Sequence, residues 1–234
     1  MKSSLRNMVI VLFSITAISA LLVALVNDMT KEAIALSQQE AKNAAKFKVV
    51  NTTPEEARVA QDTVCTISDF NITVSTIVRH SDNSVVGYAV EAPSITKSGY
   101  GDRITLMVGF IEQDDKTIIN QVEVISQKET PGLGANMTKP GNSLERSIVN
   151  MNPAELTFSV SKEGGSFDAL TGSTISSRAY ANAVETAYAG YLWATGRLDL
   201  SNDSIEAAPT GASMPMDESY NVEPEAQKGE NDNE

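Results

Sequence analysis

The segment Asp168-Ala-Leu-Thr-Gly-Ser-Thr-Ile-Ser-Ser177 joins a short turn to a long helical pattern, and the rest of the chain is organised around it. It is rich in hydroxyl side chains, at Thr171, Ser173, Thr174, Ser176 and Ser177. The first N–H groups of a helix have no partner within the helix, and the helix dipole adds partial positive charge there. Gly172 lets the backbone approach closely or take a positive φ angle. The segment therefore predicts a phosphate site at a helix N-terminus.

A simpler interpretation of the same segment is an ordinary N-cap, in which the hydroxyl of Thr174 or Ser176 accepts a hydrogen bond from the first turn. The longer pattern, Asp-x-x-[Ser/Thr]-Gly-[Ala/Ser]-Thr-x-[Ser/Thr], resembles the sequence that a flavin transferase recognises when it joins FMN to threonine. In proteins of that kind the phosphoester forms on the last threonine of the Gly-x-Thr unit, which is Thr174 here. Asp168 matches the acidic position, and Ser173 stands where alanine is commoner.

The composition limits the rest of the chain. Its 234 residues allow one domain of ordinary size with appendages. The net charge is −12, with nine acidic residues and one lysine from Ser201 onward, so nucleic acid is not expected as a partner. Residues 201–234 hold almost no bulky apolar side chain and predict a disordered acidic tail. Cys65 and His80 are the only residues of their types, which argues against an internal disulfide and a transition-metal site.

Residues 8–26 contain no charged side chain and, as a helix, are long enough to cross a bilayer core of about 30 Å. Lys2 and Arg6 precede them and Asp28 follows, so residues 1–28 predict a cytoplasmic N-terminus and a transmembrane helix. The alternative is a cleaved signal peptide, but no small-x-small cleavage site follows Val26. We expect a retained single-pass anchor.

The remaining chain divides into a helical stalk over residues 29–62 and a domain over residues 63–200. Pro54 ends the long helical pattern, and a short helix is predicted over residues 55–61. Runs rich in β-branched residues predict strands at 71–78, 85–91, 104–111 and 117–126, and another at 156–160. A short helix is expected after Pro140, capped by Asn142 or Ser143, and a long one over 176–195, ended by Gly196. Its buried stripe comprises Tyr180, Val184, Ala187, Tyr188 and Tyr191.

A second glycine-rich segment, Gln127-Lys-Glu-Thr-Pro-Gly-Leu-Gly134, follows the last of the paired strands. Pro131-Gly132 predicts a type II turn, in which the glycine supplies the positive φ angle. A functional interpretation adds that Gly132 and Gly134 leave room for a flat ring, whose polar edge Glu129 and Thr130 would bind. Residues 99–101 (Gly-Tyr-Gly) are either a plain loop or the border of such a ligand site.

Together, the anchor, Gly99-Tyr-Gly-x-x-Ile-x-x-Met-Val-Gly109, Glu129-Thr-Pro-Gly-Leu-Gly134 and the segment at Asp168 resemble the G subunit of the Rnf/Rsx ion-translocating electron transport complex over residues 1–196. The C subunit of the sodium-pumping NADH:quinone reductase shares its FMN-binding domain. The resemblance implies an α+β fold with a mainly antiparallel sheet and packed helices. Gln127 is a departure, because such chains usually carry histidine there.

The resemblance implies a site without catalytic residues or metal, in which FMN is covalently attached to Thr174. The other cofactor-binding residues would be Thr171, Gly172, Ser173, Ile175, Ser176, Glu129, Thr130, Gly132, Leu133 and Tyr100, and Asp168 would be recognised by the transferase. Expected partners are membrane and iron–sulfur subunits of the same complex, the flavin transferase and the lipid bilayer.

The resemblance also implies an activity and a location. The chain would relay electrons during ferredoxin:NAD oxidoreduction coupled to Na⁺ or H⁺ transport, and would not be active alone. It would sit in the bacterial inner membrane with its main domain on the periplasmic side. Two alternatives stay open: the FMN subunit of a quinone reductase, and a non-catalytic tethered binding domain in which both glycine motifs are only turns.

Overall fold

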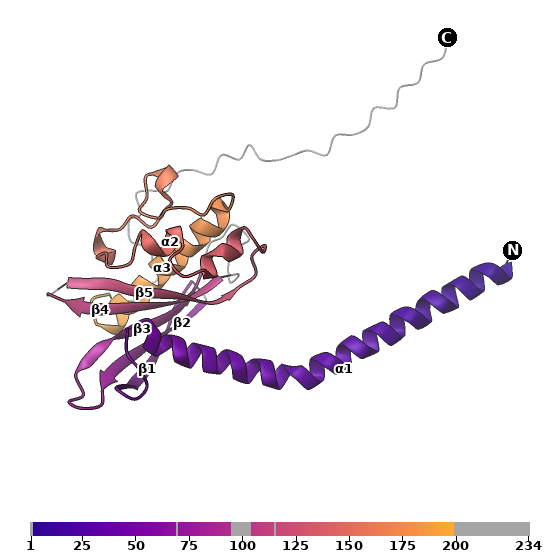
Figure 1. Cartoon of the computed structure of the whole chain (residues 1–234), viewed down its shortest axis with the longest axis horizontal. Coiled ribbons are helices and arrows are strands. Elements are labelled where there is room, and N and C mark those ends of the chain that lie inside the picture. Colours follow the sequence, from indigo (N-terminus) through magenta and orange to yellow (C-terminus); the bar gives the residue numbers. More distant parts are fainter. Residues whose placement is uncertain (1, 69, 95–103, 115, 199–234) are drawn as a thin grey trace, which may run out of the picture.

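The fold is a five-stranded antiparallel sheet between two helices, which confirms the predicted antiparallel sheet with packed helices (Figure 1). The computed structural model describes residues 2–68, 70–94, 104–114 and 116–198, with side chains from Arg6 onward. The strands follow one another in the order β1-β2-β3-β4-β5. Their bounds are β1 Ala57–Ile67, β2 Phe70–Arg79, β3 Val85–Pro93, β4 Ile104–Gln113 and β5 Lys116–Gln127.

Strands β2 to β5 confirm the four predicted strands, each slightly longer than expected. Strand β1 was not predicted, and the short helix expected over residues 55–61 is wrong, because Ala57 to Ile67 pair with β2. The middle of β1 is largely exposed at the edge of the sheet, and its register shifts between Val59 and Gln61. An exposed, bulged edge strand lacks the apolar alternation by which a strand is recognised.

Helix α1 (Lys2–Lys48) is continuous from the apolar segment to the sheet, so the helical part of the stalk ends at residue 48. It is the one helix of the described residues that is long and apolar enough to cross a membrane, by length and composition. The Thr30 hydroxyl donates to the Val26 carbonyl at 2.8 Å. Such bonds often bend helices, and α1 is bent part-way along in Figure 1.

Helix α3 (Thr174–Ala194) covers one face of the sheet and buries the main core. Tyr180, Val184, Ala187 and Tyr191 of the predicted stripe are buried, and Tyr188 packs against them from a partly buried position. Aromatic rings dominate this face: Phe110 stacks on Tyr191 with ring centroids 4.9 Å apart. The helix therefore binds the sheet through bulky side chains.

The end of α1 covers the other face through a smaller core. The Val49 carbonyl lies against Gly109 so closely that a Cβ there would be 1.9 Å from its oxygen. Asn120 Nδ2 donates to the same carbonyl at 2.8 Å. Three ion pairs tie the last turns of α1 to β3, β1 and β5: Lys42–Glu91 at 2.5 Å, Lys46–Asp62 at 2.9 Å and Lys48–Glu123 at 2.5 Å.

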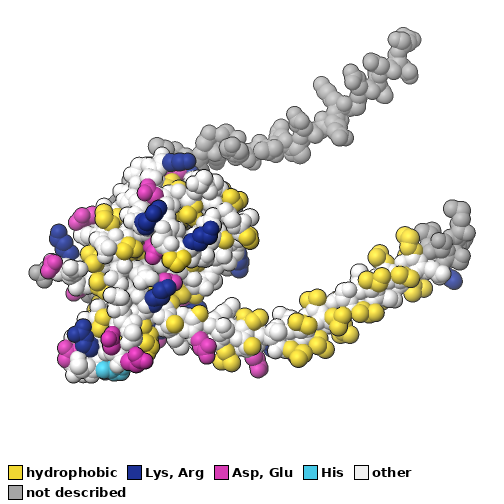
Figure 2. Space-filling model, viewed as in Figure 1, with side chains coloured by type: hydrophobic (Ala, Val, Ile, Leu, Met, Phe, Trp, Pro, Cys, Tyr) yellow, Lys and Arg dark blue, Asp and Glu magenta, His cyan; other side chains and the backbone are white. Residues whose placement is uncertain are grey.

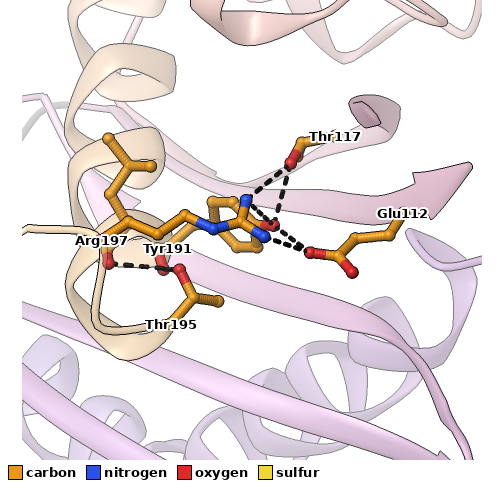
Figure 3. A network of polar contacts seen from close by, with 6 residues as sticks. Glu112, Thr117, Tyr191, Thr195 and Arg197 are labelled. Atoms are coloured by element: carbon orange, nitrogen blue, oxygen red, sulfur yellow. Dashed lines mark hydrogen bonds and ion pairs between the residues drawn. The ribbon is translucent and has the colours of Figure 1, made fainter. Parts of the chain in front are cut away.

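A polar network fixes the C-terminal end of α3 (Figure 3). The Tyr191 hydroxyl lies 3.0 Å from Thr117 Oγ1 and 3.2 Å from Glu112 Oε1. Arg197 donates to Glu112 Oε1 at 2.7 Å, and its guanidinium lies 5.7 Å from the centre of the Tyr191 ring. Gly196 follows the helix with φ +69°, which confirms the predicted end.

The chain between β5 and α3 forms short helical turns: η1 (Gly134–Thr138), α2 (Ser143–Arg146), η2 (Pro153–Glu155) and η3 (Ser161–Glu163). Asn142 caps α2 by accepting from the Glu145 N–H, as predicted. The strand expected over residues 156–160 is wrong. Only Val160 forms a bridge, with Phe167, because the chain turns back through Gly165, which lies directly against the Ser159 backbone.

Candidate functional site: a cleft between two glycine turns

The first wall of the site is the turn that follows β5. The Leu133 N–H donates to the Thr130 carbonyl at 3.1 Å, and Gly132 has φ +81°. This confirms the predicted turn and its need for glycine. Just before this turn, the Gln127 side-chain oxygen accepts from the Glu129 N–H at 2.6 Å, which holds Glu129 against the end of the strand.

The second wall is a similar turn at the start of α3. The Ser173 N–H donates to the Leu170 carbonyl at 3.1 Å, and Gly172 has φ +73°. Ser177 ties this turn to the helix: its hydroxyl donates to the Ser173 carbonyl at 2.8 Å and accepts from the Leu170 N–H at 3.0 Å.

The residue at the N-cap position is Ser173, and no side-chain hydrogen bond caps the helix there. The interpretation of Thr174 or Ser176 as an ordinary N-cap is therefore wrong. Thr174 is the first residue of α3, partly buried, and Ser176 directs its hydroxyl elsewhere.

Ser176 joins the two walls. Its hydroxyl donates to Glu129 Oε2 at 2.6 Å, a contact between residues far apart in the chain. Gly134 lies beside this pair, and a Cβ there would be 2.5 Å from Ser176 Oγ and 2.6 Å from Glu129 Oε2. A Cβ on Gly172 would lie 3.6 Å from the Leu133 side chain. The hydrogen bond across the walls therefore requires glycine at 134.

A cleft of about 360 Å³ separates the two turns. Its lining comprises Glu129, Thr130, Leu133, Gly134, Gly172, Ser173, Thr174, Ile175 and Ser176. The structure thus brings together most of the predicted site. Thr171 and Gly132 lie in the adjoining turns and do not line the cleft, and Asp168 is exposed beyond it. Tyr100 lies outside the described residues.

The cleft combines three kinds of surface. The start of α3 presents N–H groups that have no partner within the helix, together with positive dipole charge, which suits an anion. Leu133 and Ile175 contribute apolar side chains, 47% and 48% exposed, which suit a flat ring. Glu129 Oε1 is buried and has no hydrogen-bond partner among the described residues, so it can accept a hydrogen bond from a ligand.

Known proteins share the segments that build this cleft. A family model described as FMN-binding domain matches residues 99–189, which include both turns. The G subunit of the ion-translocating oxidoreductase complex of Methanosarcina acetivorans is 30% identical over 185 residues, covering 78% of this chain and 92% of the relative. The chain belongs to the family of these G subunits.

Two further relatives carry the same name. The G subunit from Pseudomonas aeruginosa is 29% identical over 196 residues, covering 80% of this chain and 87% of the relative. The G subunit from Shewanella oneidensis is 30% identical over 176 residues, covering 71% of this chain and 79% of the relative. No solved structure matches the chain.

Within this G-type subunit, the two glycines of the first turn have different tasks. Both were expected to leave room for a ring. Gly132 has no neighbour within 4 Å of its Cβ position, so its positive φ angle is what requires glycine. Gly134 is the residue on the cleft wall. Neither the residue type nor the spacing in the sequence indicates which of the two glycines has which role.

Sequence reasoning also missed the part that Ser177 plays in this G-type subunit. Ser177 is buried and bonds both ends of the turn from Leu170 to Ser173. The sequence shows that Ser177 ends the hydroxyl cluster, but it does not show which hydroxyls of the cluster point into the protein. Sequence reasoning likewise assigned no contact between Ser176 and Glu129, because their proximity arises only when α3 packs beside the end of β5.

Proposed function

We propose that Thr174 carries FMN through a phosphoester, and that this G-type subunit relays electrons within an Rnf-type complex. That complex would couple ferredoxin:NAD oxidoreduction to the transport of Na⁺ or H⁺. When bound, FMN supplies acceptance and donation of one or two electrons. The observation that carries the proposal is the cleft, since it sets the Thr174 hydroxyl at a helix N-terminus together with the unpartnered carboxylate oxygen of Glu129.

The phosphate end of the cofactor fits the start of α3. Thr174 is the first helical residue, so the N–H groups of the first turn lie beside its side chain and would stabilise a phosphodiester anion. Ser177 and Gly172 fix the turn before it, so the backbone that carries the hydroxyl is held in place. The chain's contribution here is to bind and orient the phosphate.

The ring end fits the apolar part of the cleft, to which both walls contribute. Leu133 and Ile175 are exposed apolar side chains in the cleft lining, and an aromatic ring would cover them. Two hydrogen bonds hold Glu129 in place: its Oε2 accepts from the Ser176 hydroxyl, and its backbone N–H donates to the side-chain oxygen of Gln127. Glu129 Oε1 is therefore positioned to accept a hydrogen bond from the polar edge of a ring.

Asp168 fits recognition by the transferase better than contact with FMN. Its N–H donates to Ser147 Oγ at 3.2 Å, which anchors the backbone, while the residue itself is exposed. An exposed acidic residue near Thr174 and outside the cleft is accessible to a modifying enzyme.

We further propose that α1 anchors the chain in the inner membrane. The apolar part of the helix would span the bilayer with Arg6 on the cytoplasmic side, and the sheet domain would lie on the periplasmic side. The relatives are named as subunits of a complex, which supports other subunits as partners. We propose that these are membrane and iron–sulfur subunits. The acidic tail predicted over residues 201–234 lies outside the described residues.

The test is the intact mass and the ultraviolet fluorescence of denatured protein, made together with a flavin transferase. The wild-type chain should gain the mass of one FMN less water and fluoresce on a denaturing gel. Thr174→Val removes the hydroxyl at nearly constant shape and should abolish both signals. Thr63→Val, in strand β1 and outside both the cleft lining and the segment that the transferase would recognise, is the matched control and should keep both.

Asp168→Asn should reduce the fraction of modified chain without changing the fold, because the side chain is exposed. Covalent flavin on the Thr174→Val chain would refute the attachment site. A wild-type chain that stays colourless beside an active transferase would favour a tethered binding domain instead.

A further inference from the structure

The part of α1 between the apolar segment and the sheet, residues 29–41, is exposed on all sides. Every residue from 29 to 41 is exposed, and ion pairs with the sheet domain begin at Lys42. A lone helix of this length is marginal in water, because most helical stability in proteins comes from packing. Yet the segment carries large apolar side chains: Met29 is 75% exposed and Leu36 is 67% exposed.

These apolar side chains form a line along one side of the helix. Leu22, Val26, Met29, Ala33 and Leu36 follow one another at alternating spacings of four and three. This is the heptad spacing of a helix that packs against another helix. The stripe begins in the apolar half of α1 and continues past Asp28 without a break in register. Figure 2 shows apolar side chains along α1 on both sides of its bend.

This stripe, residues 22, 26, 29, 33 and 36, points away from the sheet domain. Lys42 faces the domain, since it pairs with Glu91 of β3. It follows Ala33 by about two and a half helical turns, which sets the two side chains on opposite sides of the helix. The stripe is therefore unpartnered within the described chain, and the domain cannot cover it.

The charges around the stripe discriminate between possible occupants. Glu40 takes the next heptad position after Leu36. A parallel second copy would place two Glu40 carboxylates against each other across the seam, which is unfavourable. A different chain has no such conflict, and a lysine or arginine opposite Glu40 would complete the contact.

We infer that this stripe is a docking surface for a helix of a transmembrane partner protein, one that crosses the bilayer beside α1 and continues beyond the membrane surface. The inference rests on the proposed membership in a membrane complex. Small Ala33 at the centre of the stripe allows close approach of the two helices. The partner helix would present apolar side chains to Met29 and Leu36, and a basic side chain near Glu40.

Photo-crosslinking in membranes that hold the whole complex tests the contact. A benzophenone amino acid in place of Leu36 should form an adduct whose peptide maps to the end of a transmembrane helix in another protein of the complex. The same amino acid in place of Ile34 is the control, because Ile34 is 52% exposed but lies off the stripe. Equal adducts from both positions, no adduct, an adduct with lipid only, or an adduct of two copies of this chain would each overturn the inference.

A second measurement uses a tag on this chain to purify the complex. The double substitution Met29→Gln and Leu36→Gln keeps good helix formers but removes two apolar contacts. It should lower the recovery of transmembrane subunits about tenfold, whereas Ile34→Gln should leave it unchanged. Full recovery with the double variant would contradict the inference. Covalent flavin is measured on the same samples, so a wild-type chain without flavin would count against the proposed function and not against the docking surface.

Discussion

Gly109 and Phe110 are neighbours in β4 and face opposite sides of the sheet. Phe110 is buried under α3 and stacks on Tyr191, whereas Gly109 lies under the backbone of Val49 at the end of α1. One position needs a large side chain and the other needs none. The comparison shows that the two helices are attached to the same sheet by different means.

The α3 face is a continuous core of large side chains, in which Tyr88 also packs on Tyr191, with ring centroids 5.3 Å apart. The α1 face buries mostly small residues, with Ala45, Val49 and Ala89 among them, and adds ion pairs with partly exposed side chains. Exposed ion pairs contribute little stability. The α3 face therefore supplies most of the stability, and the α1 face sets the direction in which the anchor leaves the domain.

Truncation of Phe110 should have the largest effect. Phe110→Ala removes a fully buried ring and should lower the free energy of unfolding by about 3–5 kcal/mol. Denaturant unfolding of the full chain in detergent measures this, with Phe110→Leu as the milder control. A loss below about 1 kcal/mol would show that bulk on the α3 face is not what stabilises the sheet.

Addition of a methyl group at Gly109 should have a smaller but more local effect. Gly109→Ala forces a Cβ against the Val49 carbonyl, so the end of α1 must shift, at a cost of about 1–3 kcal/mol. Hydrogen exchange should rise over residues 42–50 while α3 stays protected. Gly141→Ala is the control, since Gly141 has φ +66° and open space around it, so that only strain of about 1 kcal/mol is expected. Unchanged exchange over residues 42–50 in Gly109→Ala would mean that the close contact does not hold α1.

The smallest expected effect concerns an acidic residue on α3. Burial raises the pKa of Glu185 from 4.5 to about 7, partly offset by a hydrogen bond from Asn182. Between these values the folded chain holds a proton that the unfolded chain has lost. The stability from Glu185 is therefore complete below pH 4.5 and is lost as the pH rises through 7.

Glu185→Gln keeps the side chain neutral at every pH. Its melting temperature should exceed that of the wild type by a few degrees at pH 8 and match it near pH 4.5. Glu55→Gln, which changes an exposed carboxylate, should show no such difference. If the melting temperatures of the two variants differ from that of the wild type by the same amount at pH 8, then burial on α3 does not keep Glu185 protonated.

The elements with strong local patterns were predictable. The β-branched runs from β2 to β5, the turn at Pro131-Gly132 and the stripe from Tyr180 to Tyr191 each repeat with the period of their structure or carry its turn residues. Strand β1 and residues 156–160 were not predictable. The partner of β1 decides its conformation, and the contact of Gly165 with the Ser159 backbone replaces the expected strand.

The site divides in the same way. Thr174, Gly172 and Glu129 could be singled out because their segments resemble the motifs of the G subunits, and all three line the cleft. The sequence did not indicate which of them share a wall. Ser176 contacts Glu129 and Ser177 binds inward, while Gly132 stays outside the lining, because those outcomes depend on how α3 lies beside the end of β5.

By itself, the sequence determined the apolar anchor helix, most of the strands, both glycine turns and the family to which the chain belongs. These features depend on local periodicity and on residues with unusual backbone freedom, which are properties of short segments. Only the tertiary structure decided that the two turns face each other across one cleft and that α1 ends on Gly109. Those are contacts between segments distant in sequence, and they form only when the sheet and its two helices pack together.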